Sequence, residues 1–226
     1  MKKIFFVFLG VALMAGNAVA QDFEKNIYGV RAGLNVSNVS VQGLSADSKA
    51  GFHVAGVYQR LLLNTHPLYL ETGLQITQKG FKTEFLAETT KINPLYLEVP
   101  VMVNYKFNIK DVVTLYPSVG FYYALGIAGK GKLETAASEE FGTEAQTDKY
   151  DLFGSKGVMK RSDFGMRVSA TAEWQQFVFS LGYEFGFVNV AKSVEFDSDF
   201  EGEDFGGSDW AKMKTGNFFI SVGYNF

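Results

Sequence analysis

The last eleven residues, 216–226, limit the possible folds more than any other stretch of the chain. Counting back from Phe226, every second residue is apolar, and these residues are Tyr224, Val222, Ile220 and Phe218. The residues between them are small or polar, apart from Phe219. Because successive side chains of a strand point to opposite faces, this pattern predicts one lipid-compatible face and one interior face. Such a strand, ending on an aromatic residue, indicates a bacterial outer-membrane barrel.

The same alternation recurs along the chain. It is found over residues 28–37, 52–59, 68–77, 95–107, 114–127, 163–174, 177–187 and 216–226. Each segment is close to the length that a tilted membrane-spanning strand needs. The sequence therefore predicts an all-β fold, an eight-stranded antiparallel up-and-down transmembrane β-barrel.

The predicted connections alternate between short and long. Short turns are expected at 64–66, 108–111 and 175–176, and longer loops at 38–50, 80–91, 129–161 and 190–215. Outer-membrane barrels place short turns on the periplasmic side and long loops outside. An even number of strands then leaves both termini in the periplasm.

The distribution of charge decides which face is the interior. A soluble lipocalin-type barrel would also show alternating strands, but with an apolar interior. Here the charged residues of the strands share the polar face: Arg31, Glu71, Glu98, Lys106, Arg167, Glu173 and Glu184. In a soluble barrel these ions would fill the core, at a cost of several kcal/mol for each unpaired ion. The charge-free face would be a large exposed apolar surface. The membrane interpretation avoids both costs.

The first twenty residues have the pattern of a cleaved secretory signal. Lys2 and Lys3 precede a short apolar run, 4–15, and Ala18-Val19-Ala20 provides a small-x-small cleavage site. About a dozen apolar residues cannot cross roughly 30 Å of hydrocarbon. We therefore expect residues 1–20 to be removed and residues 21–226 to form the barrel domain, exported to the outer membrane.

Composition excludes several classes of protein. The chain has no cysteine, so disulfides, thiol catalysis and lipid modification of a cysteine are excluded. A net charge of −3 gives no support to nucleic-acid binding. After the signal, no segment approaches the eighteen consecutive apolar residues of a membrane-spanning helix. The content of 22 Phe and 24 Gly instead suits a lipid-facing β-protein with a crowded interior.

With the strands assigned, the chain resembles the PorT-like outer-membrane β-barrel family of the Bacteroidetes, a group from the Gram-negative envelope. The resemblance is carried by residues 28–35, 51–56, 78–80, 94–100, 106–107, 163–165, by Pro117 with Gly120, by 182–189 and by the terminal Gly-Tyr-Asn-Phe. It covers the whole chain after the signal and implies a small barrel. The family's name comes from a member implicated in protein secretion and gliding-type export, whereas most members resemble barrels without an assigned role.

The lumen charges are the first candidate functional residues. An eight-stranded barrel is just wide enough for side chains to fill it. Arg31 and Arg167 can then pair with some of the glutamates, which predicts an ion-pair network that closes the lumen. The alternative is a narrow gated pore in which the same residues select the solute.

Other candidate residues are weaker. His53 lies on the inner face and His66 in a turn, and neither has a serine partner at a spacing that suggests a lipid-modifying enzyme. We therefore expect no catalytic site and no cofactor. Asp197, Asp199 and Glu201 alternate like the oxygen ligands of a calcium loop, but the glycine and terminal glutamate of an EF-hand are missing. Phe226 and Tyr224 are the expected signal for the barrel-assembly machinery.

The function predicted from the sequence is structural or interactive: envelope integrity, adhesion or membership of a secretion complex, with the surface loops as contacts. The expected partners are membrane lipids and lipopolysaccharide, the assembly machinery, and an extracellular or secretion-complex protein. A small-solute channel is the alternative, and a lipid-modifying enzyme is a more distant one.

Overall fold

The computed structural model describes residues 24–41, 46–85, 88–135, 146–154, 157–192 and 213–226. The described part of the chain forms eleven strands: β1 (Asn26–Val41), β2 (Ala46–Leu63), β3 (His66–Gln78), β4 (Phe81–Phe85), β5 (Glu88–Tyr105), β6 (Phe107–Ile109), β7 (Val113–Thr135), β8 (Gln146–Asp151), β9 (Ser162–Trp174), β10 (Phe177–Gly186) and β11 (Met213–Asn225). Among these residues no helix is long and apolar enough to cross a membrane, a result that concerns helical spans alone.

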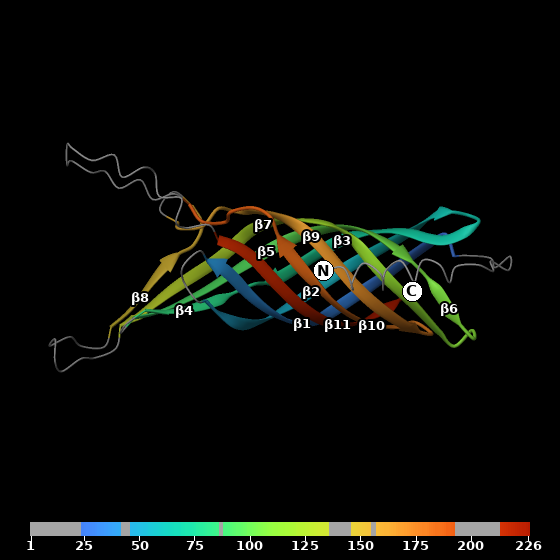
Figure 1. The fold of residues 1–226 in the computed structure, drawn as a ribbon, viewed down its shortest axis with the longest axis horizontal. Coiled ribbons are helices and arrows are strands. Elements are labelled where there is room, and N and C mark those ends of the chain that lie inside the picture. Colours follow the sequence, from blue (N-terminus) through green and yellow to red (C-terminus); the bar gives the residue numbers. More distant parts are fainter. Residues whose placement is uncertain (1–23, 42–45, 86–87, 136–145, 155–156, 193–212) are drawn as a thin grey trace, which may run out of the picture.

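Eight of these strands close into a ring (Figure 1). The order is β1–β2–β3–β5–β7–β9–β10–β11, and β11 pairs with β1 to complete it. All the pairs are antiparallel, and strands that are neighbours in the ring also follow one another in the sequence. The predicted eight-stranded up-and-down barrel is confirmed.

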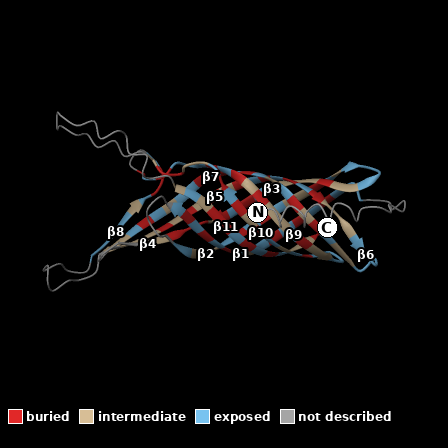
Figure 2. Cartoon of the chain, in the orientation of Figure 1, coloured by how far each residue is buried: buried red, intermediate tan, exposed pale blue. Residues whose placement is uncertain are grey.

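The predicted division into an inner and an outer face is also confirmed. Along β5, buried and more exposed residues alternate from Ile92 to Asn104, so that Glu98 is completely buried while its neighbour Val99 is 40% exposed. Figure 2 shows this alternation as bands of buried and exposed residues that cross the strands. The exposed side chains of the ring are chiefly Val, Leu, Ile and Phe. The outer surface is therefore apolar and the lumen polar.

Three of the predicted loops contain strand residues instead. In the first, 38–50, β1 continues to Val41 and β2 begins at Ala46. β4 and the first residues of β5 occupy 81–92, and the end of β7 and β8 occupy much of 129–151. Together these segments prolong one side of the barrel beyond the ring (Figure 1). The prediction was wrong here because the outward positions carry Lys, Thr and Glu. An alternation without apolar outward residues lacks the signal of a membrane strand, although the backbone pairing continues.

Short turns close the opposite end, hereafter the turn end. The turns lie at 64–65, 110–112 and 175–176. Lys110, Asp111 and Gln175 adopt positive φ values of 54°, 56° and 55°. The second turn starts later than predicted because β6 extends the ladder to Ile109, opposite Val113.

Aromatic side chains gather near both ends of the apolar surface. Near the turn end, Tyr28 lies 5.1 Å from Tyr58 and Trp174 lies 6.4 Å from Phe177, measured between ring centroids. Toward the loop end, where the longer connections lie, the rings of Phe121, Phe164 and Phe187 contact one another in series. Aromatic belts in these two positions are typical of the two interfaces of a membrane barrel.

The C-terminal residue provides the first prediction. Phe226 is 65% exposed, its ring contacts Tyr224, and its backbone N–H donates to the carbonyl of Tyr28 at 2.8 Å. We expect Phe226→Ser to reduce the amount of folded barrel in the outer membrane severalfold, because the terminal aromatic is the expected assembly signal. Quantitative blotting of outer-membrane fractions measures the effect.

Phe218→Ser is the matched control, because Phe218 is an outward residue of the same strand with 44% exposure. Equal loss from both variants would show that apolar area, and not the terminal position, determines assembly.

Candidate functional site in the barrel lumen

Four buried charges form a closed circuit in the lumen, here called the charge ring: Lys79, Glu98, Arg167 and Glu184. The Lys79 Nζ lies 2.8 Å from Glu98 Oε2 and 2.8 Å from Glu184 Oε2. The Arg167 Nη2 lies 3.0 Å from Glu98 Oε1 and also contacts Glu184 Oε1. Each cation therefore meets both carboxylates, and the formal charges of the ring sum to zero.

Neighbouring side chains complete the hydrogen bonding of the charge ring. Gln75 Nε2 donates to Glu98 Oε1 at 3.3 Å, and Arg167 donates to Gln75 Oε1 at 3.1 Å. Asn217 Nδ2 donates to Glu184 Oε2 at 2.9 Å. All four ring residues are at most 8% exposed. Burying such ions is tolerated only when partners and hydrogen bonds replace water, and this arrangement supplies both.

Aromatic rings lie against both cations. The Lys79 Nζ is 4.4 Å from the centroid of the Tyr122 ring, and the Arg167 guanidinium carbon is 4.8 Å from that of Phe219. The ring residues and their partners come from β5, β7, β9, β10 and β11 and from the C-terminal end of β3. The charge ring therefore ties opposite walls of the barrel together across the lumen.

Lys79 was not among the lumen residues predicted from the sequence, because it follows the last residue of β3. Its N–H donates to the carbonyl of Pro94 at 3.1 Å, which fixes the chain beyond the strand end and lets the side chain enter the lumen. The charges did contain a signal. The predicted inner face carries four glutamates and Asp163 but three cations, and this excess of acidic residues indicated a further cation.

The other predicted lumen charges lie closer to the turn end. Lys106 Nζ pairs with Glu173 Oε2 at 3.0 Å, with side-chain exposures of 10% and 15%. Glu71 Oε2 accepts hydrogen bonds from Gln59 at 2.7 Å and from Asn104 at 2.8 Å. The structure thus brings Glu98, Arg167 and Glu184 together and holds Lys106 and Glu173 apart from them.

The expected pairing of Arg31 with a glutamate is wrong for the described residues. Arg31 Nη2 donates to Asn225 Oδ1 at 2.6 Å, and Nη1 donates to the carbonyls of Val30 and Tyr224. The reason is position: β1 pairs with the end of β11 at this level, so that neutral oxygens of β11 lie closest.

A small cavity of about 50 Å³ lies between the two charged levels. Arg31 and Glu71 line it from the turn end, and His53, Gln75 and Arg167 line it from the other side. Since one water occupies about 30 Å³ in the liquid, this space suits one or two waters.

Apolar side chains cover the loop end of the lumen and are here called the mouth cap: Leu152, Phe153, Met159 and Val190. They are between 0% and 9% exposed and pack with Tyr96, Tyr122 and other residues of the barrel wall. Three of the four cap residues lie between 152 and 159, and Val190 comes from the segment after β10. The two segments are joined by a hydrogen bond from the backbone N–H of Lys160 to the carbonyl of Val190 at 2.8 Å.

Glycines of β7 make room for the cap. A Cβ at Gly126 would lie 2.3 Å from a carbon of the Phe153 ring, and one at Gly129 would lie 2.9 Å from Leu152 Cδ1. From the sequence, residues 129–161 were expected to form a surface loop. The glycines at these positions are instead a requirement of close packing.

The remaining sequence candidates do not form a site among the described residues. His53 is 3% exposed and its ring meets Phe219 edge-on at 5.8 Å, while His66 is exposed as the first residue of β3, directly after the turn in which it was predicted. Neither histidine bonds to a serine hydroxyl of the described chain. No group of three or more His, Asp or Glu in these residues could hold a metal. Asp197, Asp199 and Glu201 lie outside the described residues.

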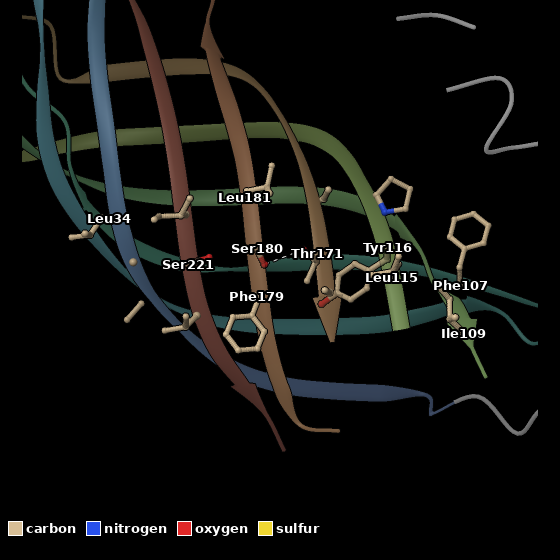
Figure 3. Close-up of a pocket in the computed structure, with 17 residues that line it drawn as sticks. Leu34, Phe107, Ile109, Leu115, Tyr116, Thr171, Phe179, Ser180, Leu181 and Ser221 are labelled. Atoms are coloured by element: carbon tan, nitrogen blue, oxygen red, sulfur yellow. Dashed lines mark hydrogen bonds between the residues drawn. The ribbon is translucent and has the colours of Figure 1, made fainter. Parts of the chain in front are cut away.

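A depression of about 920 Å³ lies on the outer surface over β1, β11, β10, β9 and β7 (Figure 3). Its lining includes the exposed side chains of Leu34, Phe179 and Leu181, and the small Ala170 and Ala172 form a low part of it. It belongs to the apolar surface between the aromatic belts, where hydrocarbon is the expected contact.

Comparison with known proteins gives a family match and several structural likenesses. A family model described as an outer membrane protein beta-barrel domain matches residues 19–192. No curated protein matches the sequence significantly. The attachment invasion locus protein Ail of Yersinia pestis is 19% identical, with 90% of this chain and 100% of Ail covered and a TM-score of 0.45. OprG of Pseudomonas aeruginosa is 12% identical, with 92% and 99% covered and a TM-score of 0.48. Neisserial surface protein A is 12% identical, with 88% and 97% covered and a TM-score of 0.44.

The charge ring leads to a prediction about stability. Lys79→Met would leave two buried carboxylates with one cation, and we expect a loss of about 3 kcal/mol, the usual cost of breaking a buried ion pair. Urea unfolding of the barrel in detergent, followed by heat-modified migration in gels, measures it.

Lys106→Met is the matched control, because Lys106 pairs with one glutamate at a more exposed position. It should lose less stability than Lys79→Met. If Lys106→Met lowers the free energy of unfolding as much as Lys79→Met or more, the charge ring is not the more important of the two ion-pair groups for stability.

Proposed function

The chain belongs to the outer membrane protein β-barrel domain family and is an outer-membrane protein, and from that premise we propose that it is a closed barrel acting through its surface. Its role is structural or interactive, in envelope integrity, adhesion or a secretion complex. The PorT-like resemblance of the sequence supports the last of these.

The observation that carries this proposal is that two barriers follow one another along the lumen. The charge ring occupies the cross-section with salt bridges, and the mouth cap covers the loop end with apolar side chains. An ion would have to displace buried, mutually compensated charges and then cross an apolar layer. A barrel built in this way presents its outer wall and loop end to other molecules.

The proposed orientation places the turn end in the periplasm. Three turns of two or three residues close that end, and both the start of β1 and the end of β11 lie there. Outer-membrane barrels have short turns on the periplasmic side. Residues 1–20 are proposed to be removed as a signal peptide, and Phe226 and Tyr224 to be recognised by the assembly machinery.

A small-solute channel is the second candidate, favoured by the cavity between the charged levels. Arg31 and Arg167 line this cavity, so it would be the start of a polar path through the lumen if the side chains of the charge ring rearranged. For a catalytic role we find no pairing of His53 or His66 with a serine hydroxyl in the described chain, so we propose none.

Planar-bilayer conductance separates the closed barrel from the channel. We expect no conductance from wild type. Glu98→Ala with Arg167→Ala removes one charge of each sign from the ring, and this double variant should produce measurable conductance. Adding Leu152→Ser and Phe153→Ser in the mouth cap should increase it further. Porin-like conductance from the wild-type protein would refute the closed barrel and support the channel.

Cysteine labelling tests the orientation, because the natural chain contains no cysteine. Thr147 lies on the exposed β8 at the loop end, and Gln176 lies in a turn at the other end. We expect a membrane-impermeant maleimide to label Thr147→Cys on intact cells and Gln176→Cys only after the outer membrane is permeabilised. The reverse pattern would invert the orientation.

A further inference from the structure

Four lysines stand directly opposite one another across neighbouring strands, hereafter the lysine row: Lys82, Lys91, Lys132 and Lys149. The register pairs Lys82 of β4 with Lys91 of β5, Lys91 with Lys132 of β7, and Lys132 with Lys149 of β8. Directly opposed residues of antiparallel strands share one face of the sheet. Neighbouring strands lie about 4.8 Å apart, so the row spans about 14 Å.

The lysine row faces outward, not into the mouth cap. Its neighbours Phe81, Ile92 and Gly131 point inward and are buried, and Tyr150 lies over Gly131 on the same inner side. Because side chains alternate along a strand, the lysines occupy the opposite face. On β5 this is the face of Leu95 and Leu97, which belong to the apolar wall of the barrel.

The height of the row matches the boundary of the apolar surface. Lys91 lies four residues beyond Leu95, which corresponds to about 13 Å along a strand and about 10 Å along the axis at a tilt near 40°. Lys130, on the same face of β7, lies two residues closer to the barrel than Lys132. A headgroup layer occupies several ångströms on each side of the hydrocarbon core. The flexible lysine stems place their charges in or next to that layer.

The charge of the row is only partly neutralised by the described chain. Lys91 Nζ pairs with Glu134 Oε2 at 2.7 Å. Asp47 is opposite Lys82 at one end of the row, and Asp151 is opposite Lys130 one step closer to the barrel. Lys132 and Lys149 are exposed and form no ion pair with a described residue. Like charges directly opposite one another destabilise a sheet, so the pairing of Lys132 with Lys149 carries a cost that the ion pair of Lys91 with Glu134 offsets only in part.

The positive charges of the lysine row also affect a nearby lysine, Lys49. The pKa of the Lys49 ammonium is lowered, first by its partial burial and then by the positive charges of Lys91 and Lys132, against the smaller opposite effect of the Glu134 carboxylate. Three ammonium groups therefore act on one another here. A bound anion would remove this repulsion.

We propose that the lysine row is a binding site for the phosphate groups of lipid headgroups in the outer leaflet. The inference rests on the proposed orientation, with the loop end outside, and adds a specific ligand and specific residues to the surface role. Phosphate oxygens form strong charge-assisted hydrogen bonds with lysine ammonium groups. The position at the edge of the apolar wall favours a headgroup over a soluble polyanion, which would have no reason to bind at this height.

The test uses the full barrel in neutral detergent micelles, with fluorescent diphosphorylated lipid A as the probe. The combined change Lys91→Gln, Lys132→Gln and Lys149→Gln should raise the dissociation constant by about tenfold or more, since each lysine near an anionic surface contributes appreciably. Arginine at the same three positions should preserve binding. Raised salt should weaken wild-type binding, because exposed charges are screened.

Lys25→Gln, Arg60→Gln and Lys110→Gln form the matched control, which removes the same charge from exposed positions at the turn end. Heat-modified migration confirms that every variant is folded. An unchanged affinity in the row variant, or an equal loss in the control, would overturn the proposed site. Heparin that binds through the row as tightly as lipid A would also overturn it, in favour of a soluble polyanion.

The two proposals fail in different ways. Conductance from the wild-type protein refutes the closed barrel, and absence of Thr147→Cys labelling on intact cells refutes the orientation. Neither result alters the affinity for lipid A measured in micelles. If lipid A binds the row variant as tightly as wild type, the inferred phosphate site is refuted and the closed barrel is unaffected.

Discussion

The structure depends on the pairing of β1 with β11. Inside hydrocarbon no water is available to backbone N–H and C=O groups, so a strand assembly must have no free edge there. Thirteen residue pairs, from Gly29 with Asn225 to Val41 with Met213, close the ring. The polar interior follows from that closure, because a closed ring of eight strands sets a lumen that side chains can fill.

The narrow lumen in turn dictates how its charges are arranged. Inward positions are shielded from the bulk solvent, so each ion there requires a partner of opposite sign or several hydrogen bonds close by. The charge ring satisfies this with two cations and two carboxylates, whereas Glu71 and Arg31 rely on neutral amides and carbonyls. The loop end has a different solution. There Leu152 and Phe153 pack against apolar residues and glycines of the wall, and the buried Asp163 accepts hydrogen bonds from Tyr122 and Thr215.

The eight strands of the ring were predictable because a period of two, with one face apolar and the other charged, is compatible with few folds besides a membrane barrel. Glu98 and Val99 are neighbours whose chemistry alone assigns them to opposite faces, and the same holds along the other strands. The loop end was predicted poorly. Where the outward positions of a strand are polar, as at Lys132, the strand lacks the apolar face of a membrane strand, and the sequence pattern did not distinguish it from a loop. The mouth cap was missed because a contact such as Phe153 with Gly126 joins residues distant in the sequence, and only the fold brings them together. Lys79 was predictable only in part. The excess of acidic residues indicated a further cation, but the entry of the Lys79 side chain into the lumen depends on where β3 ends.

The prolonged side of the barrel has an open border in the described chain. Among the described strands β8 pairs with β7 alone, so its other side has no strand partner within that part of the chain. Such a border invites a strand from another molecule to add to the sheet, the first step of aggregation. Lys149 stands on that border strand, and an identical molecule approaching it would bring its own lysines. Two copies would repel each other before their strands could join, so the same charges that burden the sheet help to keep crowded barrels separate in the plane of the membrane.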